Sequence, residues 1–327
     1  MGRLKVAVTE RLYEAYTDEE AALGGLDADL VTYTLRSREE AVPALRDAQG
    51  ILVHQFPMDE ALISELKACR IISRYGIGLD NVDIPAATRR GIWVSNVPRY
   101  GAEEAVSDHA LALLLGCVRK VSFKDREIRR GNWNLHKAQK SFLLKGKTLG
   151  IVGYGRIGRV MARKCSALGF AEILVYDPYV EPAPIASGGC RKVSLEELLQ
   201  DADFISIHAP LTPETFHMFD ARAFTAMKPG AILINTARGA IVEEQALCAA
   251  VGSHRIQAAG LDVCESEPLA AESGLRGLDE VILSDHCGYY AEETLRDLRT
   301  QAALNVAAVL KGGEPLSPVN RPGTAGQ

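Results

Sequence analysis

The chain has 327 residues, of which 47% are hydrophobic and 24% charged, enough apolar material for more than one buried core. Its net charge of −5 argues against a nucleic-acid or membrane-surface protein, and no stretch reaches the roughly 18 apolar residues that span a bilayer. The seven scattered cysteines form no C-x-x-C pair, so we expect reduced thiols in a cytoplasmic protein and no metal site.

Short apolar runs alternate with helical stretches in the first third of the chain, a pattern typical of a parallel sheet covered by helices. Strands are expected at 4–9, 30–35, 50–53, 71–73 and 92–95, and helices at 59–67 and 84–89. Pro98 interrupts the pattern, because the residue before a proline disfavours helix. We therefore predict a first α/β unit of about 97 residues.

One long helix is predicted from Ala102 to about Arg130. Glu103 and Glu104 favour its first turn, and Gly131 suits its end. Its middle is apolar almost all round, so we expect it to be buried between domains or subunits.

A second α/β unit follows. Its strands are expected at 147–152, 173–176, 204–208, 231–235, 257–261 and 281–283. Ser194 and Glu197 have the spacing of a capping box at the start of a helix. A last helix is predicted from about 291 to 311.

A glycine motif marks the start of this second unit. Gly153, Gly155 and Gly158 follow the strand ending at Val152 and precede a helical stretch, with Asp177 nineteen positions further on. This context predicts a dinucleotide site, with the pyrophosphate at the helix N-terminus and the carboxylate on the ribose hydroxyls. A carboxylate would repel a 2′-phosphate, so NAD is favoured over NADP.

Three further residues suit the reduction of a keto acid. Arg238 offers a permanently charged fork for carboxylate and carbonyl oxygens. His286 can exchange a proton near neutral pH, and Glu267 can hold the far ring nitrogen and stabilise the imidazolium. All three follow predicted strands, where open α/β sheets bind ligands.

The chain resembles the D-isomer-specific 2-hydroxyacid dehydrogenase family over essentially its whole length. The matching motifs are Gly76-Ile-Gly-Leu-Asp-Asn-Val-Asp83, Val106-Ser-Asp-His-Ala-Leu-Ala-Leu-Leu-Leu115, the glycine loop, His208-Ala-Pro-Leu-Thr-Pro-Glu-Thr215, Asn235-Thr-Ala-Arg-Gly239, Leu261-Asp-Val263 with Glu267-Pro268, and Asp285-His286. The resemblance implies an α/β fold of two Rossmann-like, doubly wound parallel-sheet domains with the active site in the cleft between them.

The resemblance implies a role for each matching position. Arg238 would bind substrate, and Glu267 with His286 would form the acid/base pair. The cofactor-binding residues would be Gly153, Gly155, Arg156, Ile157, Gly158, Asp177, His208, Pro210, Thr215, Thr236, Ala237, Asp262, Val106 and His286. The substrate-binding residues would be Arg74, Tyr75, Gly76, Ile77, Gly78, Arg238 and Tyr289. Val106 as plain helix core and His208 as a structural histidine remain alternatives.

The family plan also implies discontinuous domains, with 1–97 plus 289–327 as a flavodoxin-like substrate domain and 98–288 as the NAD-binding domain. A homodimer through 98–146 is expected. Several details favour the branch that contains the C-terminal binding protein corepressors, among them Arg74 and Tyr289.

Two other functions stay open. One is a non-catalytic NAD(H)-sensing regulator of the C-terminal-binding-protein type. The other is formate dehydrogenase, an enzyme with the same fold. In that enzyme the histidine is paired with glutamine, so Glu267 disfavours this function. Asp285 stands where the family commonly has proline, so either an effect on His286 or simple exposure to solvent is possible. The substrate is expected to be a small 2-keto or 2-hydroxy acid, and its identity is left open.

Overall fold

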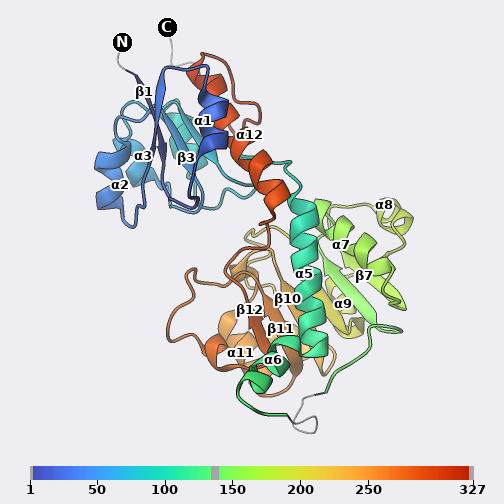
Figure 1. Ribbon diagram of the computed structural model, residues 1–327. Helices are drawn as coiled ribbons and strands as arrows, with labels where there is room; N and C mark the ends of the chain where they lie inside the picture. Colours follow the sequence, from blue (N-terminus) through green and yellow to red (C-terminus); the bar gives the residue numbers. More distant parts are fainter. Residues whose placement is uncertain (1–2, 134–139, 324–327) are drawn as a thin grey trace. The chain divides into compact units, whose positions relative to one another are not determined.

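The computed structural model describes residues 3–133 and 140–323. The chain divides into two compact units (Figure 1). Unit 1 comprises Met1–Gly101 with Ala291–Gln327, and unit 2 comprises Ala102–Tyr290. Within the described ranges, no helix combines the length and the apolar character that a membrane crossing requires.

Unit 1 is built on a parallel sheet with the strand order β2-β1-β3-β4-β5. Its strands are β1 (Leu4–Val8), β2 (Ala28–Thr32), β3 (Gly50–Val53), β4 (Ile71–Arg74) and β5 (Trp93–Ser95), and its helices are α1 (Thr17–Leu23), α2 (Arg38–Leu45), α3 (Glu60–Glu65), α4 (Ile84–Arg89) and α12 (Glu292–Leu310). Helices α1 and α12 pack on one face of the sheet, and α2, α3 and α4 pack on the other. Every residue of β3 is buried, as expected of a strand covered on both faces.

Helix α12 closes unit 1 although it lies about 200 residues away in sequence from the strands it covers. Its apolar stripe includes Leu298 and Val306, both fully buried. A Cβ atom at Gly50 would lie 2.5 Å from Cγ1 of Val306, so glycine is required there for helix and strand to approach. The guanidinium of Arg70 donates to the carbonyls of Val309 and Leu310 at 2.6 and 3.2 Å, which satisfies the C-terminal end of the helix.

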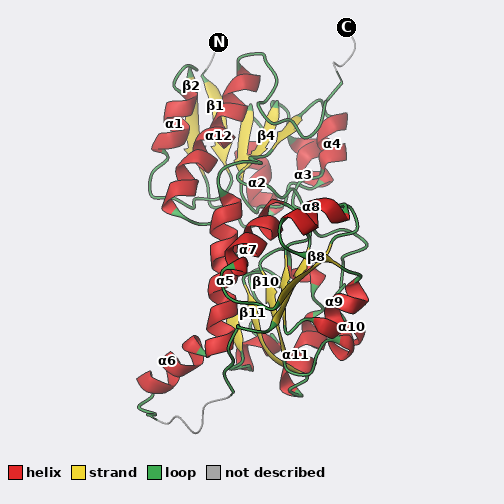
Figure 2. Ribbon diagram, turned by 90° about the vertical axis from the view of Figure 1, so that its right-hand side faces the viewer, coloured by secondary structure: helices red, strands yellow, loops and turns green. Residues whose placement is uncertain are grey.

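Unit 2 contains a parallel sheet with the order β12-β11-β10-β9-β6-β7-β8 (Figure 2). Its strands are β6 (Thr148–Val152), β7 (Glu172–Tyr176), β8 (Arg191–Lys192), β9 (Phe204–Ile207), β10 (Ala231–Asn235), β11 (Ile256–Leu261) and β12 (Val281–Leu283). Its helices are α5 (Ala102–Arg119), α6 (Val121–Arg129), α7 (Arg156–Ser166), α8 (Pro182–Ser187), α9 (Leu195–Asp201), α10 (Ala221–Ala226) and α11 (Glu244–Gly252), with the 3-10 turns η1 (Gly239–Ile241) and η2 (Gly274–Gly277).

The two faces of this sheet carry separate cores. Helices α5, α7 and α8 cover one face, and α9, α10 and α11 cover the other. The order in which the chain adds strands reverses at β6: β7 and β8 extend the sheet on one side of β6, and β9 to β12 extend it on the other, although all the strands run parallel. Ligands of open α/β sheets bind at the carboxyl ends of the strands beside such a reversal.

Two local predictions had different outcomes. One of the two hydrogen bonds of the predicted capping box is confirmed, because Oγ of Ser194 accepts from the Glu197 N–H at 3.1 Å. The prediction of a single long helix from Ala102 to about Arg130 is wrong, because the segment is divided into the two helices α5 and α6. Lys120 adopts a left-handed conformation with φ 58°, which an α-helix cannot continue through. Its side chain is buried and its Nζ donates to the carbonyl of Gln257 at 3.5 Å, a tertiary contact that the local sequence does not reveal.

Candidate active site

The three glycines of the predicted dinucleotide motif lie in the turn after β6 and in the first turn of α7, and each has a different environment. Gly153 has a φ of +92°, and a Cβ atom there would lie 2.7 Å from the backbone nitrogen of Ala209. A Cβ atom at Gly158 would lie 2.1 Å from the carbonyl oxygen of Gly153. A Cβ atom at Gly155, by contrast, would meet nothing within 4 Å. The first and third glycines therefore allow close packing, and the second leaves open space for a ligand.

Asp177 directly follows β7 and contacts this same turn. Its Oδ2 accepts a hydrogen bond from the Tyr154 N–H at 2.7 Å, and its Oδ1 accepts from the N–H groups of Tyr179 and Val180 at 2.9 and 3.2 Å. The predicted ribose-binding carboxylate thus also holds the glycine turn in place. Arg156 and Ile157 form the first turn of α7, the end of a helix that attracts anions.

Two polar atoms at the ends of neighbouring strands are buried without a hydrogen-bond partner. They are Nδ1 of His208, after β9, and Oγ1 of Thr236, after β10. The other ring nitrogen of His208 lies 2.9 Å from Oγ of Ser206, and burial lowers the pKa of His208 to about 4. Orphaned buried polar atoms are uncommon and point to a missing partner. Together with the open space at Gly155, they fit a bound dinucleotide.

The remaining predicted cofactor residues have simpler surroundings. Oγ1 of Thr215 donates to the carbonyl of Pro210 at 2.7 Å, so these two residues belong to one turn after β9. The N–H of Ala237 donates to Oδ1 of Asn235 at 3.0 Å. Val106 is buried on α5, with 8% of its surface exposed. This burial is compatible both with a place in the helix core and with the predicted cofactor contact.

Arg238 lies on a tight turn after β10. Nδ2 of Asn235 donates to the Arg238 carbonyl at 2.8 Å, which holds this turn, and Nη1 of Arg238 donates to the Ala237 carbonyl at 2.7 Å. A Cβ atom at Gly239 would lie 1.9 Å from the carbonyl oxygen of Cys264. Glycine therefore lets the turn that carries Arg238 pack directly against the segment that leads to Glu267.

Glu267 and His286 form a hydrogen-bonded pair. Oε2 of Glu267 lies 2.7 Å from Nδ1 of His286, and the Cys264 N–H donates to Oε1 of Glu267 at 3.1 Å. The two side chains remain 33% and 23% exposed, so solvent or a ligand can reach them. Because a carboxylate only accepts, Nδ1 of His286 carries the proton in this bond. Tyr289, predicted to line a substrate pocket, is half-buried three residues further on.

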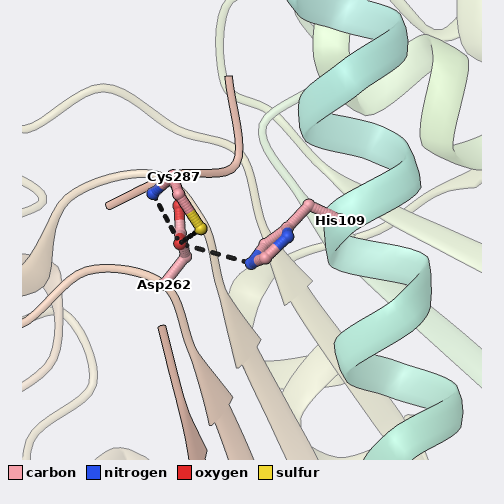
Figure 3. Close-up of side chains that lie close together, drawn as sticks. All are labelled: His109, Asp262 and Cys287. Atoms are coloured by element: carbon pink, nitrogen blue, oxygen red, sulfur yellow. Dashed lines mark hydrogen bonds and ion pairs between the residues drawn. The ribbon is translucent and has the colours of Figure 1, made fainter. Parts of the chain in front are cut away.

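His109, to which the sequence analysis assigned no role of its own, lies close to Asp262 and Cys287 (Figure 3). Nε2 of His109, on α5, lies 3.2 Å from Oδ1 of Asp262 and 2.8 Å from Oγ of Ser284. Burial alone would raise the pKa of the Asp262 carboxyl, but hydrogen bonds from His109, Ser284 and the Gly288 N–H hold it well below its usual range. His109 lies inside the motif 106–115, which was the signal available in the sequence.

His109, Asp262 and Cys287 are close enough to hold a metal ion. The contacts are better explained by hydrogen bonds, because Oδ1 of Asp262 already accepts from the Ser284 hydroxyl at 2.7 Å and the Cys287 N–H at 3.0 Å. Burial raises the pKa of the Cys287 thiol to about 11, so it remains a neutral donor. Its Sγ donates to the same Oδ1 at 3.7 Å.

The predicted substrate residues of unit 1 follow β4. Nε of Arg74 donates to the His54 carbonyl at 3.1 Å. Gly76 has a φ of +120°, and a Cβ atom there would lie 2.0 Å from Nη1 of Arg74, so the guanidinium rests against this glycine. The carbonyl of Ile77 accepts from Nδ2 of Asn96 at 2.7 Å, and Gly78 is half-buried.

Tyr75 departs from the prediction. Its side chain is 1% exposed, and its hydroxyl donates to Oε1 of Glu19 at 3.0 Å in the core of unit 1. Its N–H donates to the Val53 carbonyl at 2.8 Å. The phenol is therefore buried in unit 1 and is not exposed to a ligand.

Residues 111–288 match the family model described as "D-isomer specific 2-hydroxyacid dehydrogenase, NAD binding domain". The chain is 39% identical over 276 residues to D-3-phosphoglycerate dehydrogenase of Mycobacterium tuberculosis, covering 84% of this chain and 52% of that protein. It is 40% identical over 270 residues to glyoxylate reductase of Thermococcus litoralis, covering 81% of each chain. The chain thus spans about half the length of the phosphoglycerate dehydrogenase that it matches.

A solved structure extends the similarity to the whole fold. D-lactate dehydrogenase from Aquifex aeolicus, in a complex with NAD and lactic acid, superposes with a TM-score of 0.83 at 30% identity. The match covers 94% of this chain and 96% of that one. Both parallel-sheet units are therefore of the type found in this solved structure.

Proposed function

Because the chain belongs to the D-isomer specific 2-hydroxyacid dehydrogenase family and contains its NAD-binding domain, we propose that it interconverts a small D-2-hydroxy acid and the corresponding 2-keto acid. The observation that carries the proposal is the hydrogen bond between Glu267 and His286. It combines a proton donor with a fixed carboxylate in the unit that binds the dinucleotide.

The proposed mechanism assigns one task to each residue. Arg238 binds the substrate carboxylate and polarises the C2 carbonyl through its planar, permanently charged fork. A dinucleotide held by the glycine turn and Asp177 would, in its reduced form, supply the hydride for C2. Nε2 of His286 gives a proton to the carbonyl oxygen, and Glu267 stabilises the cationic ring before the transfer. In the oxidation direction the neutral Nε2 accepts the hydroxyl proton.

The two units would have different roles. We assign cofactor binding to 98–288 and the substrate (catalytic) role to 1–97 with 289–327. The backbone of Gly76–Gly78 and the guanidinium of Arg74 would contact the substrate carboxylate, and Tyr289 would line the pocket. Support comes from Arg74, whose Nε is held by the His54 carbonyl and whose guanidinium rests on Gly76. We also propose that the chain is most similar to the branch that contains the C-terminal binding protein corepressors. This assignment depends on Arg74 and Tyr289.

The substrate is proposed to be a small 2-keto acid. Glyoxylate is one candidate, because the Thermococcus litoralis relative is named glyoxylate reductase. We also propose a homodimer through 98–146. Residues 134–139 of that region lie outside the described residues, and the exposed apolar side chains of Val121 and Ile128 on α6 support the assignment.

The test is an NADH oxidation assay with glyoxylate, pyruvate and hydroxypyruvate, with NADPH as the cofactor control. We expect turnover with at least one acid, a preference for NADH, and a product of D configuration when pyruvate or hydroxypyruvate is reduced, since the glycolate formed from glyoxylate is achiral. Saturable NADH binding without turnover of any 2-keto acid would contradict the proposal and favour the NAD(H)-sensing regulator instead.

A further inference from the structure

Three consecutive N–H groups of the loop that carries His286 converge on one residue. The His286 N–H donates to the Asp262 carbonyl at 2.8 Å. The Cys287 N–H donates to Oδ1 of Asp262 at 3.0 Å, and the Gly288 N–H donates to Oδ2 at 2.8 Å. Asp262 therefore determines the path of the backbone on both sides of the His286 side chain.

This backbone path needs support, because His286 has a φ of 57°. Residues other than glycine adopt this left-handed conformation rarely, and it persists only where the surroundings impose it. Gly288 is adapted to the same contact, since a Cβ atom there would lie 2.8 Å from Oδ2 of Asp262. The loop is thus shaped around the Asp262 carboxylate.

The carboxylate is in turn held from the other side by α5 and β12. Asp262 is 2% exposed, so its charge has to be stabilised by donors. The single hydroxyl proton of Ser284 is given to Oδ1 at 2.7 Å. Nε2 of His109, which lies 2.8 Å from Oγ of Ser284, must therefore be the donor in that contact. The same N–H is directed at Oδ1 of Asp262, 3.2 Å away (Figure 3).

We propose that His109 is a positioning residue for His286, acting through Asp262. The inference rests on the proposed function and adds to it. The hydrogen bond to Glu267 orients the imidazole ring, and the contacts from His109 through Asp262 hold the backbone that bears the ring. The location of Nε2 depends on both, and a misplacement of about 1 Å can reduce a rate on the order of 10²-fold.

The experiment compares His109→Phe, which removes the donor, with His109→Gln, whose amide nitrogen replaces Nε2. Ser107→Ala is the matched control, because Ser107 is also a buried polar residue on α5, but its hydroxyl donates to the Glu104 carbonyl and accepts from Nζ of Lys164 instead of contacting Asp262. We expect His109→Phe to lower kcat by about 10- to 100-fold with the KM for NADH within about two-fold of wild type. His109→Gln should recover most of the loss, and Ser107→Ala should behave as wild type.

Deuterium exchange at the amides of Cys287 and Gly288 gives a readout that does not depend on turnover. His109→Phe should accelerate it, whereas Ser107→Ala should not. If His109→Phe does not fold, Ser284→Ala removes the bridging hydroxyl and should give the same two effects in weaker form. Unchanged kcat and unchanged exchange in an active protein would overturn this inference alone. A wild type that turns over no 2-keto acid would overturn the proposed function, and the exchange measurement would still decide whether His109 holds the loop.

Discussion

Oε2 of Glu267 lies 2.7 Å from Nδ1 of His286, on a loop whose backbone is bound to Asp262. Nδ1 is the donor in this contact, because a carboxylate only accepts hydrogen bonds. The orientation of the ring therefore depends on residues that follow different strands of unit 2.

The first prediction concerns this pair. His286→Ala should lower kcat by about 10²–10⁴, the usual contribution of a positioned acid/base. Glu267→Gln keeps an acceptor oxygen but loses the charge, so we expect a smaller loss than with His286→Ala. Steady-state kinetics with the best 2-keto acid measures both variants, and fluorescence titration measures the NADH affinity of each, which separates a loss of proton transfer from a loss of cofactor binding. Full turnover by His286→Ala would refute the proposed acid/base role.

The second prediction separates two glycines of one motif. Gly158→Ala places a methyl group 2.1 Å from the Gly153 carbonyl and should destabilise the protein by about 1–3 kcal/mol or more. Gly155→Ala meets no atom within 4 Å, so its stability should stay near that of wild type. Its methyl group would instead occupy space needed by the pyrophosphate, and NADH affinity should fall on the order of 10-fold or more. Denaturant unfolding without NADH, followed by NADH titration, distinguishes the two effects. Equal stability losses in both variants would contradict this division of roles.

The third prediction concerns pH. Burial lowers the pKa of His208 to about 4 in the folded protein, against an ordinary value of 6.5. Between these values the unfolded chain binds a proton that the folded protein does not, so stability is lost as pH falls from about 6.5 toward 4. The slope from this residue is at most about 1.4 kcal/mol per pH unit. His208→Gln should show a smaller loss of unfolding free energy between pH 7 and pH 5 in the absence of NADH. An identical pH dependence in the two proteins would mean that His208 is not buried in its neutral form.

The fourth prediction concerns a buried charge in unit 1. Glu19 is fully buried, and Nε and Nη2 of Arg299 donate to it at 3.0 and 2.7 Å. Arg299→Met would leave this carboxylate without its cation and should cost about 3–5 kcal/mol. Arg296→Met is the matched control on α12, because that side chain is 83% exposed, and it should change stability by less than about 0.5 kcal/mol. Adding Glu19→Leu to Arg299→Met should restore part of the loss. Similar urea midpoints for wild type and Arg299→Met would contradict the argument.

Features with a local cause were predictable from the sequence alone. The alternation of apolar runs with helical stretches predicted strands such as β3 and β10 and helices such as α4, and the spacing of Ser194 and Glu197 predicted a cap that the structure contains. The glycine turn could also be identified, because strand, turn and helix are adjacent in the chain. Arg238, Glu267 and His286 were selected by residue type and by their positions after predicted strands.

Only the tertiary structure decided how distant segments meet. His109 and Ser284 are 175 positions apart, so no local pattern links them to Asp262. Tyr75 was predicted to bind substrate, yet its side chain packs inward, where its hydroxyl donates to Glu19 on α1. Local sequence determines backbone preference and which face is apolar. The partner that satisfies a buried polar group is chosen by packing, and that depends on the whole fold.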